Sequence, residues 1–572
     1  MKPYRGRYAA GLLIVVVGSL LAVVSPLFIK AAIDSLERGD PGGAVGFFAL
    51  MIVCVGVVRA AFVFRGRYTV ISTSRLVEHD LRLRLYRKLL RLPALFFDRQ
   101  ASGDLQSRVI NDVEGVRMVT GLGMMLVVSS GLLATLSVAA MFALDARLAA
   151  LSLIPLALIT ALTNLITGRL FAQWEAIQDR LGTISTIAQE NFSGARVVRA
   201  FSREEAESRA FARASRDYLE ANIVHVRTRG AAYGLMTLLI ESTIGVTLLV
   251  GGMGIIAGTL TKGDFVAFTA YQFMLAWPVV SMGWVITMIQ RGAACMDRVS
   301  KILDAPEEET DDPPEVPPPS RGEIELRDLT FRYTGDRPPA LKGVSLKIAP
   351  GERVAVVGRT GSGKSALIQI LLGLYRAPRG SVFLDGRDIN DYPRRALRAA
   401  MGSVPQDTFL FSDTISFNIA FGTDGGGDAP EEAILKAAEG SRISEDLAAF
   451  PDGIEQVIGE RGITLSGGQK QRTAIARALI RRPGLLLLDD ALSSVDVHTE
   501  REILERLDGF MEGRTCVIVA HRFSVVSKVD RILVLDEGRL VEQGTHEALM
   551  ARGGLYAALV ARQNLEEALE QA

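Results

Sequence analysis

One short stretch of the chain combines residue types that bind phosphate. Residues 358–365 have the sequence GRTGSGKS, which matches the pattern G-x-x-x-x-G-K-[ST]. An apolar, mostly β-branched run (354–357) precedes the stretch and a helix-like apolar run (366–372) follows it, which is the strand, loop and helix context of this motif. Glycines let backbone N–H groups turn towards a polyphosphate, while Lys364 can neutralise its outer phosphates and Ser365 can ligate Mg²⁺. The sequence therefore predicts a nucleotide-binding loop made by Gly358, Arg359, Thr360, Gly361, Ser362, Gly363, Lys364 and Ser365.

Three further segments could contribute to the same chemistry. Tyr333 follows a strand-like run (324–331) and is placed to stack on a base, although an ordinary strand aromatic is an equally good interpretation. Gln406 lies in the segment GSVPQD, where its side-chain amide could ligate Mg²⁺ and report the γ-phosphate. The segment LSGGQ precedes a helix-like run (470–479), and a Gly-rich helix start can hold a phosphate through its dipole and N–H groups. This second phosphate site would be made by Leu465, Ser466, Gly467, Gly468 and Gln469.

Acidic and imidazole side chains then follow two strand-like runs. The apolar run 485–488 ends in Asp489, the position from which a carboxylate holds Mg²⁺ at the end of a buried strand. Asp496 comes soon after, and the run 517–520 leads to His521, whose imidazole could contact the γ-phosphate. A lone histidine is usually structural, but this one follows the other motifs in order.

The composition excludes several classes of protein. The chain has 572 residues, 49% of them hydrophobic, and a mean hydropathy of +0.25, which is too apolar for one ordinary soluble enzyme and too long for one domain. Its 64 Lys and Arg balance 64 Asp and Glu, so the net charge gives no argument for nucleic acid as a partner. Cys54, Cys295 and Cys516 lie far apart without metal-ligand spacing, which predicts reduced packing residues rather than disulfides or a zinc site.

Apolar runs of bilayer length fill the first half of the chain. Six such runs lie too close together for a soluble surface to cover them, which predicts six membrane spans. Pro26 and Lys30 continue the first run without a cleavage site, so we expect it to stay in the membrane. The predicted spans are 9–29, 43–64, 119–144, 148–167, 231–257 and 265–289.

The distribution of Lys and Arg predicts the orientation of these spans. Basic residues precede the first span and crowd the long loop after the second, whereas the short turns at 145–147 and 259–264 hold only Arg147 and Lys262. Both chain ends are therefore expected in the cytoplasm. The long connections after the second and fourth spans keep a helical apolar period, which predicts cytoplasmic helical stalks.

Two polar, turn-rich segments lie at the tips of these stalks, at 97–104 and 194–201. They are either docking surfaces or solvated turns. A run of acids and prolines at 307–320 is typical of an extended linker. The predicted organisation is a transmembrane domain (1–305), a linker (306–321) and a nucleotide-binding domain (322–572).

The order of these motifs resembles that of the ATP-binding cassette (ABC) ATPases, over essentially the whole chain. The P-loop together with LSGGQKQR at 465–472 is highly specific, and six spans before a single cassette are similar to an ABC exporter half-transporter. The resemblance implies a multi-domain fold, with a six-helix α transmembrane domain and long cytoplasmic helical extensions followed by an α/β P-loop ATPase domain. It also implies ATP and Mg²⁺ as cofactors and coupling helices near 99–105 and 198–204, the second of which docks on the partner's cassette.

The resemblance further implies a dimer and assigns the catalytic roles. In this family each ATP lies between the P-loop of one subunit and the LSGGQ of the other, so a single copy of each motif requires a second subunit. Asp489 and Gln406 would hold the metal with Ser365, His521 and Gln406 would serve hydrolysis, and the remaining motif residues would bind the nucleotide.

Two positions depart from the family pattern. The chain begins with MKPY where similar exporters have an amphipathic elbow helix, so we expect a shortened or misassigned start. After the Mg²⁺-binding Asp the family places a Glu that polarises the attacking water, and this chain has Asp490. That change resembles the degenerate-site subunit of a heterodimeric exporter, with slow hydrolysis at its own P-loop and a partner chain that carries the Glu. The alternative within the family is a homodimer in which Asp490 acts as a poorer base.

The expected function is ATP-driven export of a hydrophobic or amphipathic substrate across the cytoplasmic membrane. A membrane protein whose cassettes gate without pumping is the alternative from another class. Drugs, lipids and peptides all stay open as substrates. Glu241 in the fifth span is a candidate for a transport role or for hydrogen bonding between helices. Trp277 and Trp284 either line a pathway or anchor in lipid.

Overall fold

The computed structural model describes residues 2–39, 42–308, 317–334, 338–423, 425–459, 465–491, 508–520, 526 and 529–570. The chain divides into two units. One unit consists of Met1–Leu90 and Ser102–Ala305, and the other of Arg91–Ala101 and Pro306–Ala572. The short segment Arg91–Ala101 therefore belongs with the C-terminal part of the chain, although helices of the first unit flank it in sequence.

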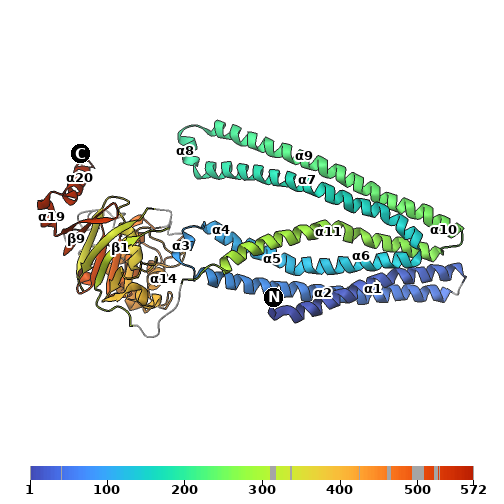
Figure 1. The fold of residues 1–572 in the computed structure, drawn as a ribbon, viewed down its shortest axis with the longest axis horizontal. Helices are drawn as coiled ribbons and strands as arrows, with labels where there is room; N and C mark the ends of the chain where they lie inside the picture. Colours follow the sequence, from blue (N-terminus) through green and yellow to red (C-terminus); the bar gives the residue numbers. More distant parts are fainter. Residues whose placement is uncertain are drawn as a thin grey trace. The chain divides into compact units, whose positions relative to one another are not determined.

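The first unit is built from long helices (Figure 1). Two of them have 48 residues each, or about 72 Å at 1.5 Å per residue, which is more than twice the thickness of a bilayer's hydrocarbon core of about 30 Å. These helices must continue well beyond a membrane. The helices of this unit are α1 (Arg5–Glu37), α2 (Gly42–Leu89), α4 (Ser102–Ser107), α5 (Val113–Met118), α6 (Met124–Leu144), α7 (Ala146–Ser193), α8 (Ala195–Ala200), α9 (Glu204–Val246), α10 (Gly252–Ile256) and α11 (Lys262–Leu303).

Five helical stretches in the described part of the chain are long and apolar enough to cross a membrane. They are Arg5–Glu37, Gly42–Leu89, Ser102–Leu144, Glu204–Ile256 and Lys262–Leu303, and each contains one predicted span. The predicted span 148–167 lies in α7, which is apolar over Ala146–Ile159. Wider helical turns at Arg108–Asp112, Val119–Gly123 and Thr247–Gly251 interrupt the regular helices without ending them.

Close contacts between helices hold the first unit together. At the crossing of α1 and α2, a Cβ added to Gly11 would lie 2.8 Å from a methyl group of Val70, so only glycine permits this approach. At one end of α11, Asp34 of α1 accepts the N–H of Gly263 at 3.1 Å. Near its other end, the Arg298 guanidinium donates two hydrogen bonds to the buried Asp112 at 2.8 and 2.6 Å.

Helices α7 and α9 run side by side and are joined at their tip by α8 (Figure 1). Phe201 directly follows α8 and is 74% exposed. The corresponding tip after α2 is shorter, with α3 (Ala94–Phe97) as its helical turn. Pro93 is the N-cap of this turn, which lies just before the predicted 99–105. The next helix, α4, overlaps the second part of that predicted segment.

The second unit contains two sheets. Four antiparallel strands have the order β2-β1-β4-β5, and six strands have the order β10-β9-β3-β8-β7-β6, with all neighbours parallel except β10 and β9. The strands are β1 (Ile324–Phe331), β2 (Leu341–Ile348), β3 (Arg353–Gly358), β4 (Val382–Leu384), β5 (Arg387–Asp388), β6 (Met401–Val404), β7 (Leu485–Asp489), β8 (Thr515–Val519), β9 (Arg531–Asp536) and β10 (Arg539–Gly544).

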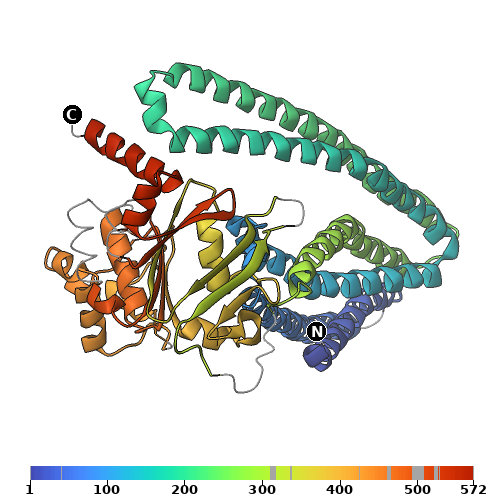
Figure 2. The same cartoon turned by 60° about the vertical axis from the view of Figure 1, so that its left-hand side comes forward.

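Helices cover both faces of the six-stranded sheet. Helix α12 shares one hydrophobic core with both sheets, and residues of α17 and α20 pack on the other face. A third core joins α14, α15 and α16, whose helices gather at one side of the strands in Figure 2. The helices of this unit are α3, α12 (Lys364–Leu371), α13 (Arg394–Ala399), α14 (Ile415–Ala420), α15 (Glu431–Gly440), α16 (Ile443–Leu447), α17 (Gly467–Leu479), α19 (His546–Arg552) and α20 (Leu555–Glu570).

Candidate functional site

The predicted phosphate-binding loop lies between the end of β3 and the start of α12. Strand β3 is buried between β9 and β8, and all three are parallel, so the loop leaves the carboxyl edge of the sheet where α/β proteins bind ligands. Gly361 and Gly363 have φ values of +81° and +101°. A Cβ on Gly363 would lie 2.5 Å from the carbonyl oxygen of Ala340, so no L side chain fits there. The two glycines therefore allow the tight turn that a phosphate-binding loop requires.

Lys364 is buried beneath this loop. Its Nζ donates hydrogen bonds to the carbonyl oxygens of Gly358 at 2.9 Å and Arg359 at 3.0 Å. Burial lowers the pKa of Lys364, and the charges of Asp489 and Asp490 oppose this effect. The ammonium group is therefore held close to both the loop and the two carboxylates, where it can neutralise phosphate.

Two of the three metal ligands predicted from the sequence, Ser365 and Asp489, are in contact. Asp489 ends β7 and is buried, and the Ser365 hydroxyl donates to its Oδ1 at 3.2 Å. An oxygen pair at this distance, one of them charged, fits the ligand preference of Mg²⁺. Ser362 Oγ is also buried and has no hydrogen-bond partner among the described residues, so the loop keeps a donor for a ligand oxygen. These residues thus fit a bound Mg²⁺-nucleotide.

Asp490 has an unusual backbone. Its φ is +52°, in the left-handed region that few non-glycine residues adopt. Its N–H donates to the carbonyl oxygen of Val519 at 3.1 Å, which ties the residue to the end of β8. The backbone from which the Asp490 side chain extends is therefore tied to the neighbouring strand.

Tyr333 and Gln406 flank this arrangement. Tyr333 is half-buried beyond the end of β1, and its hydroxyl donates to Oε1 of Gln369 on α12 at 2.9 Å. Gln406 is exposed and follows β6, which pairs in parallel with β7 so that Val404 faces Leu488. The segment that carries Gln406 therefore leaves the sheet at the edge where β7 ends in Asp489. Asp496 and His521 lie outside the described residues.

The LSGGQ segment is built separately from the loop. Ser466 caps α17, accepting the N–H of Gln469 at 3.3 Å, while the Gln469 side chain accepts the N–H of Ser466 at 3.0 Å. Asp446 on α16 holds this helix start, because it accepts hydrogen bonds from Gln469 and from both Nε and Nη2 of Arg472. Ser466 and Gly467 are exposed at the positive end of α17, ready for a phosphate supplied from outside.

Comparison with known proteins decides the family. A model described as the ABC transporter transmembrane region matches residues 8–279, and one described as ABC transporter matches residues 341–493. An ATP-dependent lipid A-core flippase from Aromatoleum aromaticum is 35% identical over 587 residues, which cover 99% of this chain and 95% of the relative. The chain belongs to the ABC transporter family.

Two further relatives agree with this assignment. YgaD of Bacillus subtilis, provisionally named a multidrug export ATP-binding/permease protein, is 33% identical over 99% of this chain and 98% of its own. The structure of a bacterial Atm1-family ABC exporter with ATP bound superposes with a TM-score of 0.81 at 29% identity, covering 98% of both chains. The predicted fold class and the resemblance to an ABC exporter half-transporter are confirmed. This ABC transporter is a multi-pass membrane ATPase that binds ATP and couples its hydrolysis to transport.

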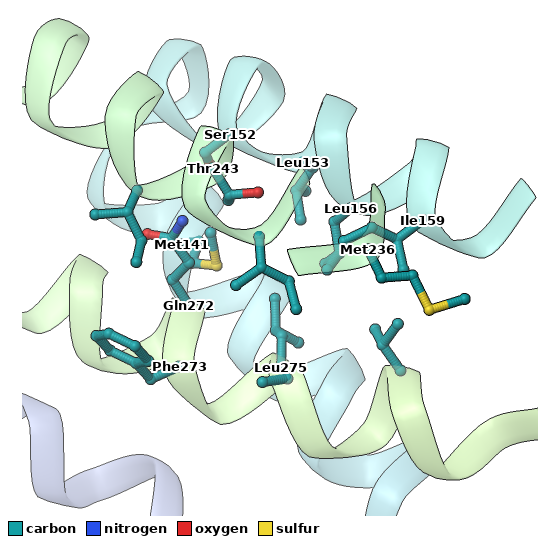
Figure 3. Close-up of a pocket in the computed structure, with 14 residues that line it drawn as sticks. Met141, Ser152, Leu153, Leu156, Ile159, Met236, Thr243, Gln272, Phe273 and Leu275 are labelled. Atoms are coloured by element: carbon teal, nitrogen blue, oxygen red, sulfur yellow. The ribbon is translucent and has the colours of Figure 1, made fainter. Parts of the chain in front are cut away.

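The transmembrane unit of this ABC transporter also contains a cavity, which the sequence motifs did not reveal. Figure 3 shows side chains from α6, α7, α9 and α11 converging on it. The empty space among these side chains is about 690 Å³, which includes space open to the surroundings. Among the described residues no charged side chain lines it. Its lining includes Met141, Leu153, Leu156, Met236, Ile240, Gln272 and Leu275.

Ser152, Thr243 and Gln272 are the polar residues of this lining, and both hydroxyls donate to backbone carbonyls of their own helices. Gln272 differs from them. Its Oε1 accepts a hydrogen bond from the Thr247 hydroxyl at 3.0 Å, while its Nε2 is buried and has no partner among the described residues. Glu241, which the sequence singled out, is exposed on α9 and does not line the cavity, although its neighbour Ile240 does. A single amide among apolar spans gives no sequence signal, so only the structure reveals Gln272.

Proposed function

We propose that this chain is the degenerate-site subunit of a heterodimeric ABC exporter, which moves a hydrophobic or amphipathic substrate out across the cytoplasmic membrane. Its own P-loop would hold Mg²⁺-ATP with slow hydrolysis, while its LSGGQ completes a competent site on a different partner chain that carries the catalytic Glu. The proposal assigns the bound Mg²⁺ to Ser365, Asp489 and Gln406.

The observation that carries this proposal is Asp490. A carboxylate that activates water must lie within hydrogen-bond reach of it, and a displacement of about 1 Å can cost on the order of a hundredfold in rate. Asp490 is one methylene shorter than Glu, and its backbone is tied to Val519, so it has little freedom to move closer. The hydrogen bonds of Lys364 to the loop and of Ser365 to Asp489 support intact binding. Binding without efficient hydrolysis is the expected result.

The cavity in the transmembrane unit supports an apolar or amphipathic substrate. An apolar lining with one unpaired amide donor suits a neutral molecule that has a large apolar part and a hydrogen-bond acceptor. Relatives named for lipid A-core and for multidrug export agree with this class of substrate. The excess of basic residues beside the stalks supports cytoplasmic termini.

We predict that Phe201 transmits force from a cassette. An aromatic side chain that is 74% exposed beside α8 would gain roughly 2 kcal/mol from burial in a docking pocket. Phe201→Ala should therefore leave ATP hydrolysis intact and lower transport at least several-fold. Phe192→Ala is the matched control, because Phe192 is 81% exposed near the end of α7. Full transport by Phe201→Ala at normal expression would show that the contact is dispensable.

Transport into inside-out vesicles tests the proposed function. With this chain and its native partner present, ATP should drive accumulation of a fluorescent phospholipid or a neutral amphipathic dye. Gln272→Leu should lower that uptake, whereas Gln290→Leu, an exposed glutamine of the same helix α11, should not. ATP-dependent ion conductance without accumulation of any probe would favour a cassette-gated protein that does not pump.

A further inference from the structure

Tyr375 links two parts of the second unit that are far apart in sequence. It follows α12, and its hydroxyl donates a hydrogen bond to Oδ2 of Asp98 at 2.7 Å. Its ring packs edge-on against Tyr333, with a centroid distance of 5.0 Å and an interplanar angle of 89°. One side chain therefore contacts both the segment Arg91–Ala101 and the tyrosine placed to stack on the base.

The segment that carries Asp98 is anchored to the second unit by more than this hydrogen bond. The carbonyl oxygen of Arg91 accepts the N–H of Glu308 at 2.8 Å. Arg398 on α13 donates to Oε1 of Glu308 at 2.9 Å. Asp98 lies just after α3, the turn that joins two long helices of the first unit. A force that moves this turn acts directly on Asp98.

Tyr333 also packs against the hydrophobic core shared by the two sheets and α12. Its hydroxyl donates to Gln369 of α12 at 2.9 Å, and the ring of Phe331 contacts it edge-on at 5.1 Å. These contacts hold one end and one edge of the ring, and Tyr375 contacts it from another side. Tyr375 is therefore one of the groups that restrain the face on which a base would stack.

The surroundings of the Tyr375 hydroxyl favour its protonated form, which is the form that donates this hydrogen bond. Burial together with the neighbouring Asp98 carboxylate raises the pKa of Tyr375 above its ordinary value. The phenol consequently keeps its proton, and an ionised carboxylate is a strong acceptor for it.

We propose that Tyr375 is a positioning residue through which docking of the Arg91–Ala101 segment sets the orientation of Tyr333 and so the affinity for the adenine base. The inference rests on the proposed role of Tyr333 as the base-stacking residue. By linkage, a nucleotide that prefers the oriented Tyr333 strengthens the docking of the segment by the same factor. The base would then be sensed through Tyr375, independently of the phosphates held by the P-loop.

The test compares ligands that differ only in the base. Full-length chain in nanodiscs is titrated with ATP and with inorganic tripolyphosphate, each as competitor of a fluorescent ATP analogue. Tyr375→Phe removes the hydroxyl and keeps the ring, and Asp98→Ala removes its acceptor. Each substitution should weaken the binding of ATP roughly fivefold or more and leave the binding of tripolyphosphate unchanged. The double variant should bind ATP no more weakly than the single variants.

The matched control is Tyr392→Phe in the same unit, because the buried Tyr392 hydroxyl donates to the carbonyl oxygen of Leu384 at 2.9 Å. Loss of that hydroxyl should not change the preference for ATP over tripolyphosphate. Unchanged ATP affinity in Tyr375→Phe, an equal loss of tripolyphosphate, or additive losses in the double variant would each overturn the proposal.

Tyr333→Ala separates this inference from the role on which it rests. If Tyr333→Ala weakens ATP relative to tripolyphosphate while Tyr375→Phe does not, the base-stacking role stands and the positioning role is wrong. If Tyr333→Ala has no such effect, both fail.

Discussion

The chain carries two sets of nucleotide-site residues, and they differ in how closely they follow the family pattern. The P-loop half is the P-loop with Asp489 and Asp490, and the LSGGQ half is the LSGGQ segment with the start of α17. In the P-loop half, Lys364 donates to the loop and Ser365 donates to Asp489, but the next carboxylate is the shorter Asp490 in a left-handed backbone. The LSGGQ half has no such departure, because Ser466 caps α17 and Asp446 anchors the helix start. On the proposed account, the chain therefore contributes more to hydrolysis at the partner's nucleotide than at its own.

The largest effect is expected from the LSGGQ half. Ser466→Arg removes the cap of α17 and puts a long cation at the exposed helix start where a phosphate would bind. ATP turnover of the complex that copurifies with a tagged copy of this chain should fall at least a hundredfold. Turnover within a few-fold of the unmodified complex would show that this half does not serve hydrolysis.

A smaller effect on turnover is expected from the P-loop half. Lys364→Ala removes the buried ammonium beside the loop, so binding of ATP to this chain should weaken more than tenfold. Because the proposal places the competent site on the partner's P-loop, turnover of the complex should fall only several-fold. The two quantities are measured together, as nucleotide occupancy of each chain by photo-crosslinking and as phosphate release. If ATP binding to this chain and phosphate release by the complex fell by the same factor, the two halves would not differ in their contribution to hydrolysis.

The sequence predicted the nucleotide site better than it predicted how the site is supported. Glycine, lysine and carboxylate motifs must lie at strand ends to bind phosphate, so their local order already indicated the fold that the family match confirmed. The roles assigned to single residues stay predictions. The contacts of Tyr375 with Asp98 and Tyr333 could not be predicted, because no local pattern links residues 277 positions apart.

In the transmembrane unit, too, the sequence predicted local features but not contacts between distant residues. Hydropathy predicted the spans, since apolar length is a local property. The cavity around Gln272 depends on four helices that converge from distant parts of the sequence, and nothing near Gln272 marks it. Glu241 was a candidate for a transport role because a charged residue is rare in an apolar span, but it does not line the cavity.

The central claim is that Asp490 makes hydrolysis slow at this chain's own P-loop. Its most direct test is the ATP turnover of two variants at Asp490. Asp490→Glu restores the longer carboxylate of the family, and Asp490→Asn removes the charge at nearly equal size. In the native complex, Asp490→Asn should change turnover less than twofold. In the purified chain alone, which should turn over slowly, Asp490→Glu should raise turnover roughly tenfold or more. If the purified chain alone already hydrolyses ATP at the rate of the complex, and Asp490→Asn abolishes that activity, Asp490 is a working base and the account is contradicted.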